Sequence, residues 1–188
     1  MNWVDAQLTA EGEQQARQAN AFWASQIETQ NIPLPERYYT SPLDRCLATA
    51  KITFTGLTLP KSQPFVPEVK ELLRETNGVH TCDRRSSKSY VREHYSSYSI
   101  EPGFTENDEL WNPDVRESDS AQDIRLRNLL DDIFTYDTST YISLTSHSGS
   151  IASILRVVSH REFRLRTGGV IPVLVKAERI QTHQSVQA

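Results

Sequence analysis

The chain has 188 residues, with 24 acidic and 20 basic side chains and a hydrophobic share of 37%. This length suits one domain, and the net charge of −4 argues against general electrostatic binding to nucleic acid or anionic membranes. No apolar run approaches the ~20 residues that cross a bilayer, and the N-terminus lacks the basic and apolar regions of a signal peptide. Two cysteines, Cys46 and Cys82, fit a reducing compartment, so we expect a cytoplasmic protein.

The first half of the chain predicts two helices around a short strand. The first helix begins at Thr9, whose hydroxyl can cap the free N–H groups of the first turn. Residues 37–40 form a strand candidate. Ser41-Pro42 is typical of an N-cap followed by proline in the first helical position, so a second helix begins there. After three prolines, residues 69–73 form another short strand candidate.

The second half predicts further alternation of helix and strand. One helix is expected at 86–95 and a longer one at 120–134, where leucine and isoleucine recur at helical spacing. A strand at 141–145 leads into a helix beginning near Ser148, and a last strand is predicted at 169–176. Alternating elements of this kind favour a three-layer α/β/α sandwich around a mainly parallel sheet.

These elements define a single domain at residues 1–180. Within it, residues 78–119 are polar and irregular, and so long a stretch is unusual in a compact domain unless it covers a site. We interpret 78–119 as an insertion over the active-site face. Residues 181–188 form a polar tail, and the oligomeric state stays open.

The first candidate for chemistry is Arg45, in the turn Ser-Pro-Leu-Asp-Arg that begins the second helix. A helix N-terminus presents free N–H groups, and a nearby guanidinium can bind a phosphate with two hydrogen bonds. The alternative is a surface arginine in an ordinary capped helix.

The second candidate is His147, followed by Ser148, at the exit of the predicted strand 141–145. Ligands of open α/β sheets bind at the carboxyl ends of parallel strands, so a histidine here can donate a hydrogen bond to a phosphoryl oxygen. The alternative is a histidine whose hydrogen bonds are satisfied within a tight turn.

The third candidate is Glu75, in Leu-Arg-Glu, with basic side chains on either side of it. A protonated carboxyl group can give its proton to a leaving oxygen. The neighbouring Arg74, His80, Arg84 and Arg85 could hold an anionic substrate, although a solvated basic loop explains each of them as well.

Together these motifs resemble the histidine phosphatase superfamily. The order is Asp-x-x-Leu-Thr-x-x-Gly from Asp5, Ser-Pro-Leu-x-Arg-x-x-x-Thr-Ala from Ser41, Leu-Arg-Glu, and Ser-His-Ser-Gly. The Gly-Val-His-x-Cys-Asp-x-Arg segment at 78–85 and Leu-Trp-x-x-Asp-x-Arg-Glu at 110–117 are similar to phosphoglycerate-mutase-like proteins of plants and fungi.

The resemblance implies a phosphomonoester hydrolase or phosphomutase acting through a phosphohistidine, without metal or other cofactor. It implies that Arg45 binds the phosphoryl group, that His147 hydrogen-bonds its oxygens, and that Glu75 is the proton donor, with Glu71 a weaker alternative. Arg74, His80, Arg84 and Ser148 are further predicted substrate contacts. The partner is a small phosphorylated substrate or inorganic phosphate.

The sequence departs from this family at one decisive motif. The family's nucleophile lies in Arg-His-Gly at the end of a first strand that precedes the Asp-x-x-Leu-Thr segment, but Arg-His-Gly occurs nowhere in the 188 residues. We therefore expect the first central strand to be missing and catalysis by this chain to be absent or impaired. A non-catalytic phospho-ligand-binding protein is the alternative.

Two weaker readings concern other ligands. His80-x-Cys82 has one half of a zinc-site spacing but no second ligand pair. The basic run 160–166 could contact nucleic acid, yet a short basic stretch on an acidic protein is more often a solvated face. We expect neither metal nor nucleic acid binding.

Overall fold

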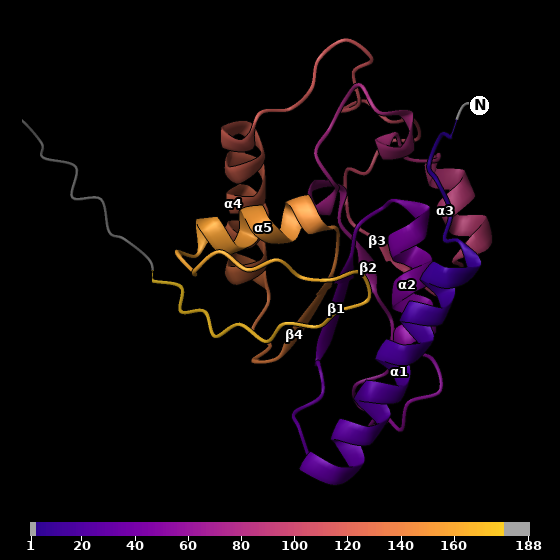
Figure 1. Cartoon of the computed structure of the whole chain (residues 1–188), viewed down its shortest axis with the longest axis vertical. Helices are drawn as coiled ribbons and strands as arrows, with labels where there is room; N and C mark the ends of the chain where they lie inside the picture. Colours follow the sequence, from indigo (N-terminus) through magenta and orange to yellow (C-terminus); the bar gives the residue numbers. More distant parts are fainter. Residues whose placement is uncertain (1–2, 179–188) are drawn as a thin grey trace, which may run out of the picture.

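A computed structural model describes residues 3–178 as a parallel sheet between two layers of helices (Figure 1). The strands are β1 (Arg37–Thr40), β2 (Glu68–Val69), β3 (Ser99–Ile100) and β4 (Ile142–Thr145). Their spatial order is β3-β2-β1-β4, and every pairing is parallel. The predicted three-layer α/β/α sandwich with a parallel sheet is confirmed.

One face of the sheet is covered by α1 (Ala10–Gln30), α2 (Asp44–Phe54) and α3 (Lys88–His94). The prediction for the start of α1 is confirmed, because the Thr9 side chain accepts a hydrogen bond from the Gly12 N–H at 3.1 Å. Val69 packs on this face among buried side chains of α2 and α3, including Leu47 and Val91. This layer therefore encloses one of the two apolar cores.

The other face is covered by α4 (Asp119–Tyr136), with α5 (Ser148–Val157) packed against it. The second core lies here, where Tyr39 of β1 packs with Leu126, Leu129 and Ile133 of α4. Tyr38 points the opposite way, with its ring 4.9 Å from that of Phe54 in α2. Successive side chains of β1 therefore point to opposite faces of the sheet and pack in different cores, as expected of a central strand.

Residues 78–119 contain more regular structure than predicted. The predicted helix at 86–95 is present as α3, and β3 adds a fourth strand that the sequence did not suggest. Two single turns of 3₁₀ helix, η1 (Glu71–Leu73) and η2 (Thr81–Asp83), frame the beginning of this segment. The strand predicted at 69–73 is therefore wrong over most of its length, since η1 begins two residues after Val69.

The start of α2 also differs from prediction. Its N-cap is Leu43, and Ser41 lies two residues earlier. The Asp5 carboxylate supplies the missing cap from a distance, accepting a hydrogen bond from the Asp44 N–H at 2.9 Å. Its second oxygen accepts from the Ser86 N–H at 2.8 Å, so Asp5 joins the N-terminal segment, α2 and the 78–119 segment.

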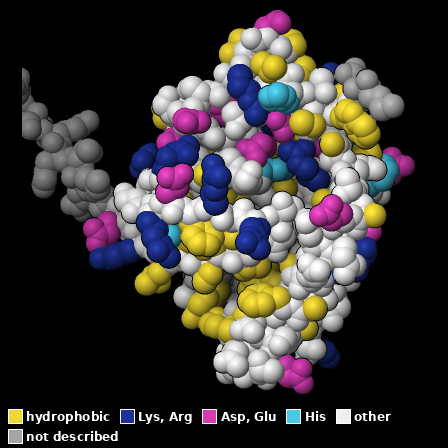
Figure 2. Space-filling model, viewed as in Figure 1, with side chains coloured by type: hydrophobic (Ala, Val, Ile, Leu, Met, Phe, Trp, Pro, Cys, Tyr) yellow, Lys and Arg dark blue, Asp and Glu magenta, His cyan; other side chains and the backbone are white. Residues whose placement is uncertain are grey.

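The strand predicted at 169–176 is wrong, because this segment is irregular. A strand needs a neighbour for its backbone hydrogen bonds, and among residues 3–178 β4 pairs with β1 alone and forms the edge of the sheet. Figure 2 shows hydrophobic side chains gathered near the lower end of β4. Exposed apolar side chains in or beside these segments include Tyr141, Phe163, Val170 and Leu174.

Two other predictions concern the C-terminal tail and membrane-spanning segments. The polar tail at 181–188 lies outside the described residues. Across residues 3–178, no helix combines the length and the apolar character that a membrane crossing requires.

Candidate anion-binding site

The sheet brings the two main candidate motifs together. β1 and β4 are adjacent and parallel, with Thr40 opposite Thr145, so both chains leave the sheet at the same edge. Beyond β1 the chain enters α2, which carries Arg45 in its first turn, and beyond β4 it reaches His147, the N-cap residue of α5. The carboxyl ends of parallel strands are where open α/β sheets bind ligands.

Arg45 is held by three residues, two of them in η2 and one at the start of α5. Its Nε–H donates to Nδ1 of His147 at 3.3 Å, its Nη1 to the carbonyl oxygen of Cys82 at 2.7 Å, and its Nη2 to Oδ1 of Asp83 at 2.9 Å. These bonds use one N–H of each nitrogen, which leaves one further N–H on each terminal nitrogen. The side chain is 22% exposed, so the guanidinium group is only partly buried by these contacts.

His147 is buried beside Arg45. Its Nε2 lies 2.8 Å from the hydroxyl of Ser41. Because Nδ1 accepts from Arg45, Nδ1 carries no proton and Nε2 is the protonated nitrogen of a neutral ring. Burial, reinforced by the charges of Arg45, Arg74 and Arg125, holds the pKa of His147 well below its usual value.

A thiol shares this buried space. The Sγ of Cys46 lies 3.4 Å from Nε2 of His147. Burial raises the pKa of Cys46 to about 12, so the thiol stays protonated and unreactive at neutral pH.

Glu75 lies against the first turn of α5. Its Oε2 accepts a hydrogen bond from the Gly149 N–H at 3.1 Å, two residues beyond His147. A β-carbon at position 149 would come within 2.1 Å of Oε1 of Glu75, so glycine is what allows this approach. The structure therefore groups Arg45, His147 and Glu75 around the N-terminus of α5.

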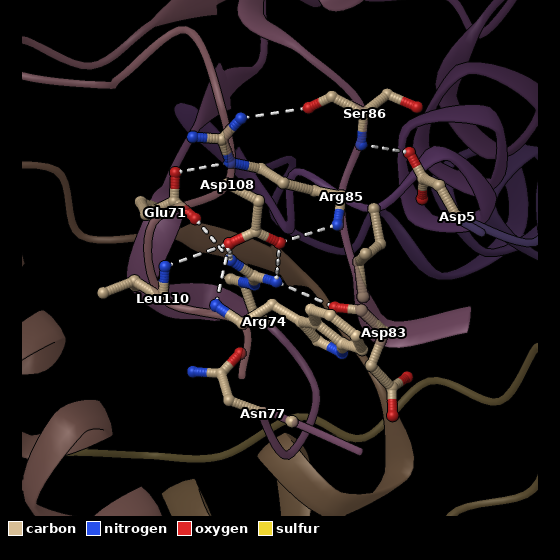
Figure 3. A network of polar contacts seen from close by, with 12 residues as sticks. Asp5, Glu71, Arg74, Asn77, Asp83, Arg85, Ser86, Asp108 and Leu110 are labelled. Atoms are coloured by element: carbon tan, nitrogen blue, oxygen red, sulfur yellow. Dashed lines mark hydrogen bonds and ion pairs between the residues drawn. The ribbon is translucent and has the colours of Figure 1, made fainter. Parts of the chain in front are cut away.

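Arg74 has a different place from the one predicted (Figure 3). Its guanidinium is fully buried and donates to both carboxylate oxygens of Asp108, at 2.6 and 2.5 Å, and to Oε1 of Glu71 at 2.9 Å. Oε2 of Glu71 in turn accepts from Arg85 at 2.7 Å. The predicted substrate contacts of Arg74 and Arg85 are corrected, because this buried network fixes the 78–119 segment and leaves both guanidinium groups out of reach of a ligand. Both carboxylate oxygens of Glu71 are paired with arginines, Oε1 with Arg74 and Oε2 with Arg85, so Glu71 is not available as the proton donor.

The other predicted contacts are exposed. Arg84 lies over the ring of Trp111, with its guanidinium carbon 5.4 Å from the ring centroid. His80 is exposed, and its carbonyl oxygen accepts from the indole N–H of Trp111. Ser148 is the exposed first residue of α5. Their predicted roles as substrate contacts stay predictions.

Sequence reasoning missed Asp83 and Arg116. The two carboxylate oxygens of Asp83 accept from Arg45 and from Arg116, at 2.9 and 3.0 Å. Both residues belong to motifs recognised in the sequence, Cys-Asp-x-Arg and Asp-x-Arg-Glu. Their pairing could not be seen there because 33 positions separate them.

Two cavities lie elsewhere and do not suit a phosphate. The larger, about 420 Å³, is lined by four carboxylates, of Glu71, Glu101, Glu109 and Asp132, together with apolar residues. The second, about 350 Å³, is lined by two cations, but carboxylates of the same lining pair with both of them. The cations are Arg37 and Lys70, and the carboxylates are those of Glu68, Glu101, Asp132 and Asp137. Neither cavity is lined by Arg45, Glu75 or His147. Electrostatics therefore favours the Arg45 site for an anion.

The fold and the site define an α/β sandwich with an arginine–histidine pair at the carboxyl ends of its central strands. The chain belongs to the histidine phosphatase superfamily (branch 1), whose pattern matches residues 1–169.

Fungal relatives share much of the sequence. A "Probable phosphoglycerate mutase" of Arthroderma benhamiae is 64% identical over 178 residues, which are 95% of this chain and 53% of that protein. "Phosphomutase-like protein 3" of Candida albicans is 40% identical over 181 residues, 96% of this chain and 55% of that protein. The chain thus spans about half the length of these curated relatives.

Solved structures share the fold. The alpha-ribazole phosphatase of Shigella flexneri superposes with a TM-score of 0.53 at 19% identity, covering 86% of this chain and 74% of that one. A mycobacterial glucosyl-3-phosphoglycerate phosphatase gives a TM-score of 0.51 at 20% identity, covering 86% and 72%.

Proposed function

We propose that the Arg45–His147 site binds the phosphoryl group of a small phosphate monoester or inorganic phosphate, and that the whole protein is a phosphomonoester hydrolase or phosphomutase acting through a phosphohistidine. The observation that carries the proposal is the pair of N–H groups left on the terminal nitrogens of Arg45, beside a neutral buried histidine. A planar guanidinium with two donors matches two oxygens of a phosphoryl group.

Each side chain has a distinct part in the proposed reaction. Arg45 neutralises charge on the transferring group, and the Nε2–H of His147 turns from Ser41 to a phosphoryl oxygen. Glu75 gives a proton to the leaving oxygen and later takes one from the attacking water. The bond from phosphorus to the leaving oxygen breaks as a bond from phosphorus to a histidine nitrogen forms. In the second step the oxygen of water bonds to phosphorus as the phosphorus–nitrogen bond breaks, which releases inorganic phosphate and the free histidine.

The attacking histidine is absent from these 188 residues, which contain no Arg-His-Gly. None of His80, His94, His147, His160 and His183 occupies the expected motif. Among residues 3–178 one edge of β4 has no partner strand, and β4 leads to His147, so a strand added at that edge would end beside the proposed pocket. We expect the family's first strand at that edge, carrying the nucleophile.

An activity assay tests this function. The chain alone should hydrolyse p-nitrophenyl phosphate at or near background. The same chain extended at its N-terminus by a strand ending in Arg-His-Gly should gain activity, and a matched extension ending in Arg-Gln-Gly should not. Failure of the Arg-His-Gly extension to restore hydrolysis in a folded protein counts against the proposal.

The missing motif also favours a second candidate, a phospho-ligand-binding protein without catalysis. The same Arg45 site would serve it. Phosphate binding by the chain, combined with no activity in any extended form, would support this second function over the first.

A further inference from the structure

Asp83 contacts three arginines at the centre of the site. Oδ1 accepts from Arg45 at 2.9 Å, Oδ2 accepts from Arg116 at 3.0 Å, and its carbonyl oxygen accepts from Arg74 at 2.8 Å. Its side chain is 7% exposed, whereas that of Arg116 is 36% exposed. A buried carboxylate with both oxygens committed to different guanidinium groups has one allowed orientation.

That orientation is fixed by the backbone of the 78–119 segment. Asp83 ends η2, and its N–H donates to the carbonyl oxygen of His80 at 3.0 Å. Nη1 of Arg116, the atom that contacts Asp83, also lies 2.9 and 2.7 Å from the carbonyl oxygens of Thr76 and Gly78, so its two N–H groups are shared among three acceptors. The far end of the segment is thereby attached to its beginning, with the Asp83 carboxylate between them.

The contacts of Arg45 show what this arrangement does. Asp83 and the Cys82 carbonyl hold the two terminal nitrogens, and this places the Nε–H against Nδ1 of His147. The protonated nitrogen of His147 is then Nε2, the one that points to Ser41. The carboxylate therefore acts on the histidine through the arginine.

We propose that Asp83, braced by Arg116, is a positioning residue that orients the Arg45 guanidinium and thereby keeps His147 in its Nε2–H form. The inference rests on the proposed function in one respect, the use of this site for phosphate. The orientation of Arg45 and the tautomer of His147 are properties of the free protein.

A purely electrostatic role of Asp83 and a positioning role predict opposite effects of its removal on phosphate affinity. Asp83 is an anion next to the proposed anion site, so its removal should strengthen phosphate binding if its effect is purely electrostatic. If Asp83 positions Arg45, removal should weaken binding. An asparagine has one acceptor oxygen, so in Asp83→Asn the amide group faces one of the two guanidiniums with N–H groups and cannot hold both.

The experiment uses the chain labelled with ¹⁵N at histidine. Imidazole nitrogen shifts distinguish protonated from unprotonated nitrogens, and His147→Gln assigns the signals of His147. The unsubstituted chain should show the Nε2–H form alone, and Asp83→Asn should show a mixture of both tautomers. Phosphate affinity, measured by calorimetry, should fall about tenfold or more in Asp83→Asn.

Two further variants complete the design. Asp123→Asn is the matched control, because Asp123 is a half-buried carboxylate that likewise pairs with an arginine, Arg156, at 2.7 Å, but its partners lie on α5 and do not include Arg45. It should change neither readout. Asp83→Glu keeps the charge but moves the carboxylate, so it should give the same mixture of His147 tautomers as Asp83→Asn. It takes the place of Asp83→Asn in the experiment if that variant does not fold.

The outcomes separate the two proposals. An unchanged His147 tautomer in folded Asp83→Asn or Asp83→Glu overturns the positioning role, as does tighter phosphate binding. If the unsubstituted chain binds no phosphate but the tautomer still changes in the Asp83 variants, positioning stands and the proposed function fails.

Discussion

The Nε–H of Arg45 donates to Nδ1 of His147 at 3.3 Å, although 102 positions separate the two residues in the chain. The bond is possible because β1 and β4 are adjacent and parallel, so the segments that follow them begin at the same edge of the sheet. It also requires His147 to be neutral, since a protonated imidazole has no acceptor nitrogen.

The neutral state of His147 should make stability depend on pH. Its pKa is held low in the folded protein by burial and by nearby arginines, whereas the unfolded value is about 6.5. Unfolding therefore takes up a proton below pH 6.5. The free energy of unfolding should be highest above that pH and fall as the pH drops, by up to about 1.4 kcal/mol per pH unit from this residue.

Urea unfolding between pH 7.5 and 5 measures this effect. His147→Gln should show a shallower fall than the unsubstituted chain, and His94→Gln, which changes an exposed side chain, should not. The raised pKa of Asp5, caused first by burial, acts in the opposite direction and is common to all three proteins. Equal slopes in the three proteins would show that His147 is not held neutral by the fold.

The buried pair of Arg74 and Asp108 should be strongly coupled. Burial opposes ionisation of Asp108, but the hydrogen bonds and charge of Arg74 outweigh it and hold the pKa of Asp108 below its usual value. Arg74→Met leaves the Asp108 carboxylate buried without a guanidinium, and Asp108→Leu leaves Arg74 with Glu71 as its one remaining ion-pair partner among residues 3–178. Each change alone should cost about 3–5 kcal/mol of unfolding free energy. The double variant should lose far less than the sum.

A double-mutant cycle by urea denaturation checks this coupling. If the two losses simply add, the pair is not the element that fixes the 78–119 segment.

Gly78 should be essential for the attachment of the same segment. It has φ +87°, and a β-carbon there would come within 1.8 Å of the carbonyl oxygen of Val115. Gly56, with φ +82° and open space around it, provides a matched control. Gly56→Ala should cost about 1 kcal/mol from backbone strain alone, whereas Gly78→Ala should cost at least about 2 kcal/mol more, because backbone must shift. Equal losses in urea unfolding would contradict the close packing of Gly78 on Val115.

Local sequence patterns were sufficient to predict much of the fold. The cap at Thr9, the strand before Ser41 and the strand before His147 follow from hydrogen-bonding side chains and apolar periodicity over a few residues. The strand predicted at 169–176 had the same kind of pattern, but a strand also depends on a neighbour, and sequence pattern does not reveal whether that neighbour is present.

The site was predictable in its residue types and less so in their partners. Arg45 and His147 sit where a strand meets a helix, which a sequence shows. Whether an arginine faces a ligand or a carboxylate depends on residues far along the chain. Arg74 meets Asp108 across 34 positions, and Asp83 meets Arg45 across 38, so a buried ion pair and a positioning contact looked alike in the sequence.

The central claim is that Arg45 and His147 form a phosphate site, and calorimetry with inorganic phosphate tests it most directly. The chain should release or absorb heat on saturable binding of one phosphate, and Arg45→Ala should abolish that signal while Arg84→Ala, on the exposed face beside Trp111, reduces it far less. No saturable heat with the unsubstituted chain, or equal binding by Arg45→Ala, would contradict the account.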